Sequence, residues 1–260
     1  MSMNNIKRLP YGIADFEYVM RDNLYYVDKT MYIPILEEQP NYLMFIRPRR
    51  FGKSLLLSML KTYYDKAKKD QFEEIFGSLW IGKHPTPLMG RYQVMHLDFS
   101  QIGGSIDELE KKFDEYLCYR LNAFVRKYAD DYPDYFIEEF FKEECGTNKL
   151  IMITTVARSL KIPMYLIIDE YDNFTNVVLS EKGEEVYHKM THAEGFYRDV
   201  FKKFKGTFER IFFTGVSPVT LDDLTSGFNI GWNISTLFYF DKLLGFSTEE
   251  VREMFTYYKG

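Results

Sequence analysis

Four short, strongly apolar segments constrain the fold of this chain more than any other feature. They cover residues 42–46, 94–99, 164–168 and 211–214, and longer segments with helical spacing of apolar residues lie between them. Segments this short and apolar are typical of parallel strands that are buried on both faces and covered by helices. The alternation predicts an α/β fold, with a mainly parallel sheet of about five strands and right-handed crossovers.

Two longer segments are predicted to be helices of this α/β fold. In residues 105–128, apolar side chains recur at intervals of three or four positions, and Ser105 with Glu108 forms a capping box at the start. Residues 184–205 form a second amphipathic segment, which is more highly charged. Both helices are expected to pack an apolar face against the sheet.

The two ends of the chain differ from its centre. Residues 1–40 are expected to form an N-terminal arm that packs on the core, with short helices opened by Asp15 and Asp28. Residues 41–242 are expected to form the core itself. Residues 243–260 hold a helix-start signal followed by about two turns, which we interpret as the beginning of a truncated helical second subdomain.

Composition excludes several classes of protein. Hydrophobic residues make up 46% of the chain and aromatic residues 18%, which argues against intrinsic disorder. The net charge of −5 provides no overall basic field for nucleic acid or anionic lipid. Two cysteines, Cys118 and Cys145, are too few for a disulfide scaffold, and we expect reduced, buried thiols. With neither a signal-peptide pattern nor an apolar membrane segment in the sequence, we expect a cytoplasmic protein.

The turn after the first apolar segment carries a phosphate-binding pattern. Gly52, Lys53 and Ser54 lie between this predicted strand and an amphipathic helix, which is the order of a P-loop. Loop N–H groups and the helix N-terminus attract anions, lysine binds the β- and γ-phosphates, and serine binds Mg²⁺. Arg47 stands where the general pattern has its first glycine. The alternative interpretation is a basic surface turn before an ordinary helix.

Two carboxylates follow the most apolar predicted strand, at 164–168. Asp169 is expected to bind Mg²⁺, and Glu170 to orient and polarise a water for attack on the γ-phosphate. Ligands bind at the carboxyl ends of strands in open α/β sheets, which is where this pair falls. The alternative is a pair of solvated acids at a strand end. Asp172 either contributes to the metal site or, as we favour, caps the following loop.

The segment at 211–214 ends in small polar residues. Thr214 is our first choice for a polar residue that senses the γ-phosphate, and Ser217 is the second. Taken by themselves, these residues are better explained as a simple strand end followed by a turn. Arg49 and Arg50 could contact the nucleotide phosphates, a nucleic-acid backbone or a neighbouring subunit, and a solvated basic turn is an equally good interpretation. An arginine finger would need a direction that sequence does not specify.

Several motifs together resemble the bacterial AAA-ATPase-like family. They are LPYGIADF at 9–16, YYVDKT at 25–30, RPRRFGKS at 47–54, LIIDEYDN at 166–173, TGVSP at 214–218 and DLTSGFN at 223–229. RPRRFGKS is the usual loop of that family, so Arg47 is similar to its pattern. The resemblance also implies that Asp28, Lys29 and Thr30 could line the adenine side of the site, although spacing alone makes them a helix start.

The resemblance implies roles for individual residues. Lys53 and Ser54 would contact phosphate and Mg²⁺, Asp169 would bind the metal, and Glu170 would be the catalytic acid. The residues expected to contact the nucleotide are Pro48, Arg49, Arg50, Phe51, Gly52, Lys53, Ser54, Leu55 and Thr214. Members of the family commonly carry a nuclease-like domain of the PD-(D/E)xK type, for which these residues show no counterpart.

We therefore expect a Mg²⁺-dependent ATPase that drives or regulates a fused or partner nuclease-like module. The choice of ATP over GTP follows from the resemblance. Two other functions stay open: a nucleotide-binding switch with negligible turnover, and a small-molecule P-loop kinase. Adjacent carboxylates at 169 and 170 suit activation of water better than capture of a substrate hydroxyl, which makes the kinase the less favoured of the two.

Overall fold

The computed structural model describes residues 6–102, 108–173, 196–216 and 231–259. The chain forms two compact units that alternate along the sequence. The first comprises residues 1–40, 47–91 and 234–260, and the second comprises residues 41–46 and 92–233. Segments from near both chain ends therefore belong to one unit. The sequence-based limits of 1–40, 41–242 and 243–260 stay a prediction.

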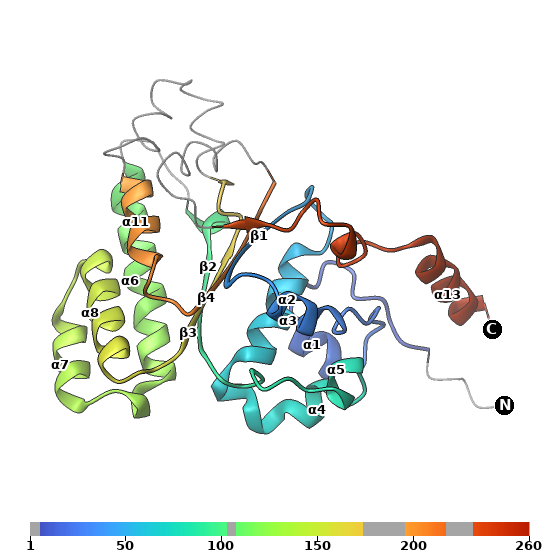
Figure 1. The fold of residues 1–260 in the computed structure, drawn as a ribbon, viewed down its shortest axis with the longest axis horizontal. Coiled ribbons are helices and arrows are strands. Elements are labelled where there is room, and N and C mark those ends of the chain that lie inside the picture. Colours follow the sequence, from blue (N-terminus) through green and yellow to red (C-terminus); the bar gives the residue numbers. More distant parts are fainter. Residues whose placement is uncertain (1–5, 103–107, 174–195, 217–230, 260) are drawn as a thin grey trace, which may run out of the picture. The chain divides into compact units, whose positions relative to one another are not determined.

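A parallel sheet forms the centre of the second unit (Figure 1). Its strands are β1 (Tyr42–Ile46), β2 (Gln93–Asp98), β3 (Met164–Asp169), β4 (Arg210–Gly215) and β5 (Trp232–Asn233). They lie in the order β2-β3-β4-β1-β5, and every neighbouring pair is parallel. The predicted α/β class is confirmed, and the four apolar segments are the first four strands. Each residue of β3 is buried, because the strand lies inside the sheet.

The strand register aligns the carboxyl ends of the strands at one edge of the sheet. Asp98 at the end of β2 pairs with Asp169 at the end of β3. On the other side, Thr214 of β4 pairs with Phe45 of β1, and Gly215 pairs with Ile46. Polar side chains of β2, β3 and β4 therefore reach the same edge, at which β1 also ends.

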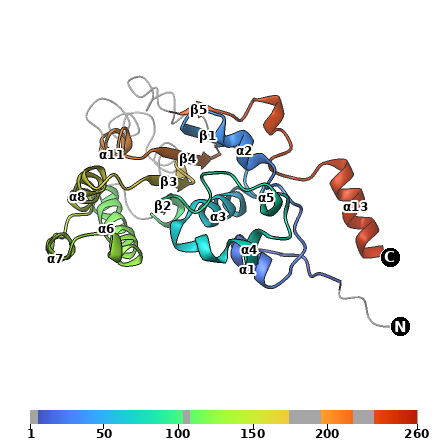
Figure 2. The same ribbon diagram turned by 60° about the horizontal axis from the view of Figure 1, so that its bottom comes forward.

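Four helices of the second unit lie to one side of this sheet (Figures 1 and 2). They are α6 (Leu109–Lys127), α7 (Asp134–Lys142), α8 (Gly146–Ser159) and α11 (Phe196–Phe204), with α7 the farthest from the strands. Their apolar side chains share a core with alternate strand residues, including Met95, Leu166 and Phe213. The helix predicted at 105–128 is α6, although Ser105 of its expected capping box lies outside the described residues. The described part of the segment 184–205 contains α11.

The first unit consists mainly of short helices. They are α1 (Phe16–Arg21), α2 (Tyr32–Glu37), α3 (Lys53–Tyr64), α4 (Phe72–Phe76), α5 (Trp80–Lys83) and α13 (Thr248–Lys259), with short 3-10 turns at 66–71 and 238–240. α1 packs on α3, where the backbone N–H of Phe16 donates to Ser58 Oγ at 2.9 Å. Asp15 caps α1 as predicted, because its carboxylate accepts from Tyr18 N–H at 3.0 Å.

The expected cap of the second helix is wrong. α2 begins at Tyr32 with Met31 as its N-cap residue, well after Asp28. The Asp28 carboxylate instead accepts hydrogen bonds from Thr30 and, at 2.7 Å, from the backbone N–H of Trp80. A tertiary contact with the start of α5 has therefore replaced the local capping role.

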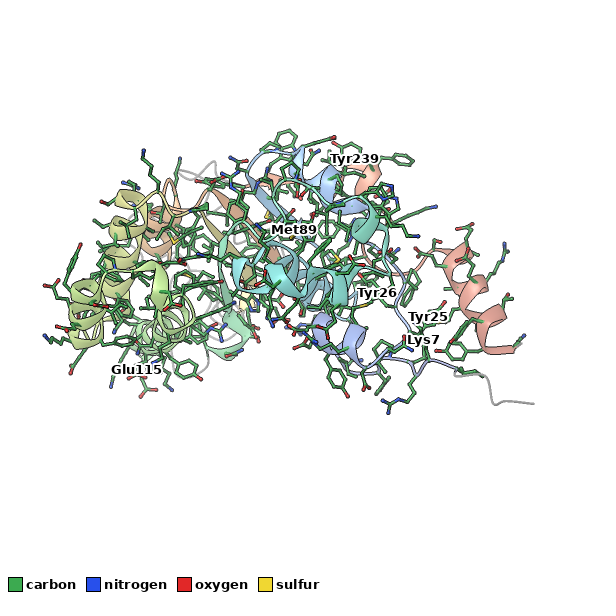
Figure 3. The ribbon with its side chains drawn as sticks, turned by 90° about the horizontal axis from the view of Figure 1, so that it is seen from below. Lys7, Tyr25, Tyr26, Met89, Glu115 and Tyr239 are labelled. Carbon is green, nitrogen blue, oxygen red and sulfur yellow. The ribbon has the colours of Figure 1, made fainter. Side chains whose placement is uncertain are left out.

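The helix-start signal near residue 247 forms the N-terminus of α13. Ser247 and Glu250 make a reciprocal capping box, with hydrogen bonds of 3.2 Å and 2.8 Å. At the other end of the helix, Tyr257 and Tyr258 bond the backbone of Lys7 and pack against the Tyr25 ring. Figure 3 shows Lys7 and Tyr25 beside this helix. The N-terminal segment therefore fixes the C-terminal helix within the first unit.

The thiols are free, as predicted, but less buried than expected. Cys118 and Cys145 are both half-buried and form no disulfide. Cys145 lies at the start of α8, where Asp114 of α6 supplies the helix cap. The Asp114 carboxylate accepts from the backbone N–H groups of Gly146 and Thr147, each at 2.8 Å. Burial alone would raise the pKa of Asp114, but these hydrogen bonds outweigh it and the pKa lies below its usual value.

Asp114→Asn should destabilise the protein by about 1 kcal/mol at pH 7, because a neutral amide is a weaker cap than a carboxylate. The folded-state pKa is lowered, so this stabilisation is present above the unfolded pKa and is lost as pH falls below about 4. Urea unfolding at pH 7 and pH 3 measures both effects. Glu115→Gln is the matched control, since Glu115 is an exposed neighbour on α6 (Figure 3).

A difference between Asp114→Asn and wild type that stays constant from pH 7 to pH 3 would contradict the assignment of a depressed pKa. A loss no larger than that of Glu115→Gln would show that the cap contributes little to stability.

Candidate functional site

The predicted phosphate loop contains two residues with a left-handed backbone. It follows β1 directly and ends at Gly52, which is the N-cap residue of α3 and has φ of 91°. Arg50 also has a positive φ, of 67°, which is uncommon for a residue with a side chain. Pro48, Arg49, Arg50 and Phe51 are exposed. Left-handed residues also occur in the backbone nests that bind anions.

Lys53 begins α3 and folds back over this loop. Its side chain is buried, and Nζ donates to the carbonyl oxygens of Arg47 at 3.0 Å and Pro48 at 3.1 Å. Ser54 is exposed in the first turn of the same helix, and Leu55 is half-buried. The lysine ammonium therefore adds its charge to the positive end of the helix dipole at the start of α3.

Arg47 has a structural role at the start of the loop. Its Nη1 donates to the Ser235 carbonyl at 2.8 Å, and its side chain is half-buried. Burial lowers the pKa of the guanidinium from its usual value, while the negative charge of Asp241 opposes that change. An arginine stays charged in proteins, so Arg47 ties the loop to the segment after β5 by a charged hydrogen bond. A glycine at this position would lack that contact.

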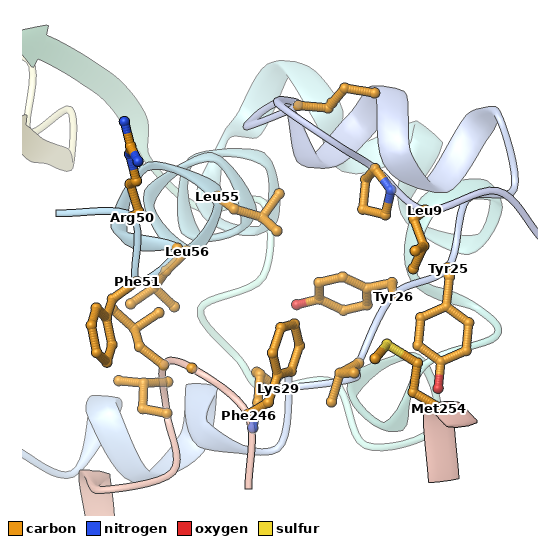
Figure 4. Close-up of a pocket in the computed structure, with 17 residues that line it drawn as sticks. Leu9, Tyr25, Tyr26, Lys29, Arg50, Phe51, Leu55, Leu56, Phe246 and Met254 are labelled. Atoms are coloured by element: carbon orange, nitrogen blue, oxygen red, sulfur yellow. The ribbon is translucent and has the colours of Figure 1, made fainter. Parts of the chain in front are cut away.

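A pocket of about 530 Å³ adjoins the loop within the first unit (Figure 4). Residues 50–52 and the first turns of α3 form one wall. The N-terminal segments at 9–13 and 25–29 form a second wall, and residues 243–246 with Met254 form the third. The lining is mostly apolar and aromatic, and the volume falls in the range typical of small-molecule sites. The pocket is therefore large enough for a nucleoside.

The acidic end of β3 belongs to the second unit, where a hydrogen bond joins it to β4. Asp169 is buried, and its Oδ1 accepts from Thr214 Oγ1 at 2.7 Å. The same oxygen accepts from the Glu170 backbone N–H at 3.0 Å. Two of the predicted site residues, from segments far apart in the sequence, are therefore in direct contact. Ser217, the second choice for the sensor, lies outside the described residues.

The turn after β3 has a strained start and is fixed by β4. Glu170 is half-buried and has φ of 49°, in the left-handed region. Tyr171 N–H donates to the Thr214 carbonyl at 3.0 Å, and Asp172 accepts from Val216 N–H at 3.0 Å. Asp172 therefore caps the end of the neighbouring strand β4, rather than the loop after β3 for which it was predicted. Such strain at a non-glycine residue is often found at functional sites.

Gly215 makes this close arrangement possible. A Cβ atom at that position would lie 2.4 Å from the Tyr171 ring and 2.6 Å from the Asp172 carboxylate. The backbone of β4 can approach the turn only because residue 215 has no side chain.

Asp98 was not predicted as a site residue, although it pairs with Asp169 in the sheet. Its carboxylate accepts from Ser100 N–H at 3.0 Å, Ser100 Oγ at 2.6 Å and Gln101 Nε2 at 2.9 Å. These contacts make it a local turn cap. Its position next to the acidic pair could have been found only from the register, because the sequence shows a single acid in a strand.

The predicted site residues fall into two sets. Those of the loop belong to the first unit, together with the pocket, whereas Asp169, Glu170 and Thr214 belong to the second. Asp28 and Thr30 serve the start of α5, while Lys29 lines the pocket. Within the described ranges, no three His, Cys, Asp or Glu side chains gather as a metal site. None of the described helices is long and apolar enough to cross a membrane.

Removing the Thr214 hydroxyl tests the contact at the end of β3. Thr214→Val keeps the side-chain shape but takes one hydrogen bond from a buried carboxylate, so we expect a loss of about 1–3 kcal/mol in unfolding free energy. Urea denaturation measures the loss. Thr62→Val is the matched control, because its buried hydroxyl donates only to a helix carbonyl, that of Ser58. Equal losses of unfolding free energy in the two variants would show that the hydrogen bond to Asp169 stabilises the protein no more than an ordinary helix hydrogen bond.

The chain was compared with known proteins. A family model described as "Predicted AAA-ATPase" matches residues 10–225. The chain is also similar to a protein of Azotobacter chroococcum mcd 1 described as "Uncharacterized protein in vnfD 5'region", with 34% identity over 111 residues. That similarity covers 40% of this chain and 20% of the relative, so it spans about a fifth of the relative's length. No solved structure matches the chain.

Proposed function

This chain belongs to the predicted AAA-ATPase family, and we propose that it binds ATP with Mg²⁺ and hydrolyses the bond between the β- and γ-phosphates. The observation that carries the proposal is the phosphate loop. Lys53 is held over a loop with two left-handed residues, at the N-terminus of α3 and beside a pocket of about 530 Å³. A triphosphate needs such an anion-binding turn, and its nucleoside needs an apolar pocket next to it.

In this proposal, the loop residues bind the phosphates. Pro48, Arg49, Arg50, Phe51, Gly52 and Leu55 contribute through the loop and the first turn of α3. The Lys53 ammonium moves from the carbonyls of Arg47 and Pro48 to the β- and γ-phosphates, where it neutralises the charge that develops on the leaving oxygen. The nucleoside occupies the adjoining pocket.

The proposed metal ligands are Ser54 and Asp169, one from each unit. A hydroxyl and a carboxylate are the hard oxygen ligands that Mg²⁺ prefers, and water and phosphate oxygens commonly complete its octahedral shell. Ser54 is exposed and accessible to the metal ion. Asp169 is oriented by Thr214 and by its neighbour's N–H. Bound Mg²⁺ would neutralise charge on the β- and γ-phosphates.

Glu170 is proposed to orient and polarise the attacking water. Glu170 follows the last residue of β3 and has a left-handed backbone, and strain of this kind at a residue other than glycine is often found at functional sites. Thr214 is proposed as the sensor, since it couples the Asp169 carboxylate to β4. We further propose, from the family resemblance, that turnover occurs in the cytoplasm and drives or regulates a fused or partner nuclease-like module.

Glu170→Gln should lower ATP hydrolysis by at least about 100-fold, because the amide keeps the shape of the carboxylate but cannot accept a proton from water. ATP affinity should stay within about twofold of wild type. Phosphate release and titration calorimetry measure the two quantities. Glu144→Gln, at an exposed position of the second unit, is the matched control. Unchanged turnover in Glu170→Gln would exclude the assigned role, and tight binding without turnover in wild type would favour a nucleotide-binding switch.

Lys53→Met should weaken ATP binding by about 10- to 100-fold, which is the range expected for loss of a charged hydrogen bond to phosphate. Calorimetric titration with MgATP measures the change. Lys61→Met removes an equal charge from the last turn of the same helix and should leave affinity nearly unchanged. Equal affinities of the two variants would show that the loop lysine does not contact the nucleotide.

A further inference from the structure

β2 forms one edge of the sheet, where a strand of another chain could pair with it. Among the described residues, β2 pairs only with β3. It runs for six residues without a proline or a lysine, which are the residue types that commonly protect an edge strand. β5, at the other edge, is only two residues long and offers little backbone for pairing. β2 is therefore the edge that needs to be covered.

Two tyrosines of α6 accept hydrogen bonds from backbone N–H groups of β2. Asp98 N–H donates to Tyr116 Oη at 2.6 Å. Val94 N–H donates to Tyr128 Oη at 2.9 Å. Burial raises the pKa of the Tyr116 phenol to about 12, so its oxygen remains a neutral acceptor at neutral pH. Figures 1 and 2 show α6 beside β2, which is the last strand of the sheet on that side.

An arginine between these tyrosines donates to a carbonyl of the same strand. Arg120 Nη2 and Nε donate to the His96 carbonyl at 2.7 Å and 3.2 Å. In a parallel pair, alternate residues direct their N–H and C=O groups to opposite sides of the strand. Gln93 N–H donates to the Pro163 carbonyl, on the β3 side, so residues 94, 96 and 98 face away from β3. α6 therefore pairs with one backbone group at each outward-facing residue of β2.

The spacing of these side chains along α6 matches the spacing of their partners along β2. Tyr116 and Arg120 are four residues apart, or about 6 Å along a helix, and their partners are two residues apart, or about 6.6 Å along a strand. The next position along the helix is Phe124, which has no polar group. Tyr128 packs edge-on against the Phe124 ring and reaches back past it, because helical side chains lean toward the N-terminus.

We infer that Tyr116, Arg120 and Tyr128 take the place of a further strand and keep β2 from pairing with a second copy of this chain. Two-fold dimers are the commonest homo-oligomers, and a two-fold axis at this edge would place β2 antiparallel to its own copy. The outward N–H and C=O groups of the two strands would then bond one another. The alternative is that these hydrogen bonds only hold α6 on the sheet. The inference concerns the second unit and does not depend on nucleotide binding.

Truncation of two of these side chains tests the inference. The opened variant combines Tyr116→Ala with Arg120→Ala, which uncovers the carboxyl end of β2 and leaves the buried apolar residues of α6 unchanged. The matched control combines Tyr119→Ala with Lys111→Ala, because both side chains are exposed on the same helix. Sedimentation velocity over a range of about 1 to 100 μM measures self-association. Hydrogen exchange of residues 93–98 shows whether β2 takes part in it.

The opened variant should self-associate at least about tenfold more tightly than wild type, whereas the control should not. In the dilute opened variant, the Asp98 amide should exchange about tenfold faster than in wild type, because it has lost its acceptor. At high concentration the same amide should become protected again, since the second copy then provides an acceptor. If the opened variant does not fold, Arg120→Ala alone uncovers the His96 carbonyl and is judged by its self-association and by the protection of residues 93–98.

Three results would overturn the inference while leaving the proposed function intact. One is a folded variant that associates no more tightly than the control, as expected if the hydrogen bonds only hold α6 in place. Another is association without renewed protection of residues 93–98, which would place the contact elsewhere on the protein. The third is rapid exchange of the Val94 and Asp98 amides in wild type, a result that needs no variant to fold.

Discussion

The hydrogen bond from Thr214 to Asp169 connects the two central features of the second unit, its sheet and its acidic turn. A buried carboxylate is costly unless its oxygens are paired, and here the neighbouring strand provides the partner at 2.7 Å. This pairing is possible because the strands are parallel, so that their carboxyl ends meet at one edge. Two hydrogen bonds then fix the turn from Glu170 to Asp172 to the end of β4. Tyr171 N–H donates to the Thr214 carbonyl, and Val216 N–H donates to the Asp172 carboxylate.

The first unit differs from the second in the sign of the charge that it concentrates. It gathers positive charge around the loop, from Lys53, from the helix N-terminus and from the three arginines at 47, 49 and 50. Backbone carbonyls accept hydrogen bonds from both Lys53 and Arg47. A carbonyl oxygen restrains a cation through a hydrogen bond without adding a negative charge of its own to the loop.

Much of the sheet was predictable because its signal is local. Continuous apolar runs gave the first four strands, and the polar residues that end β3 and β4 were expected at one edge. The N-cap of α1 was also predictable, since Asp15 bonds a residue three positions away. The helix cap predicted at Asp28 was wrong because the contact that its carboxylate makes is not local: it accepts from the distant Trp80 N–H. No pattern in the sequence predicts a contact between Asp28 and Trp80.

The candidate site could be proposed from the sequence where the expected chemistry calls for a particular residue type, as at Lys53, Asp169 and Thr214, and these roles stay predictions. It was not predictable where packing alone builds the wall. Phe246 and Met254 line the pocket, yet neither carries a chemical motif that distinguishes it from other apolar residues. Arg47 was a departure from the general loop pattern, and only its bond to the distant Ser235 explains why an arginine belongs there. The left-handed backbone at Glu170 could not be predicted either, because glutamate is not a residue type that indicates a positive φ.

The discontinuity of the first unit has a consequence for how the protein is made. The polypeptide passes between the units four times, and residues 92–233 are synthesised before residues 234–260 can complete the first unit. Contacts between segments so far apart must wait for a long intervening stretch to close, which slows folding. During synthesis, the N-terminal segment and α3 therefore leave the ribosome early. They lack the packing partners at residues 243–254 until that segment has also been synthesised. During that interval their apolar surfaces stay open to chaperones and to misassembly.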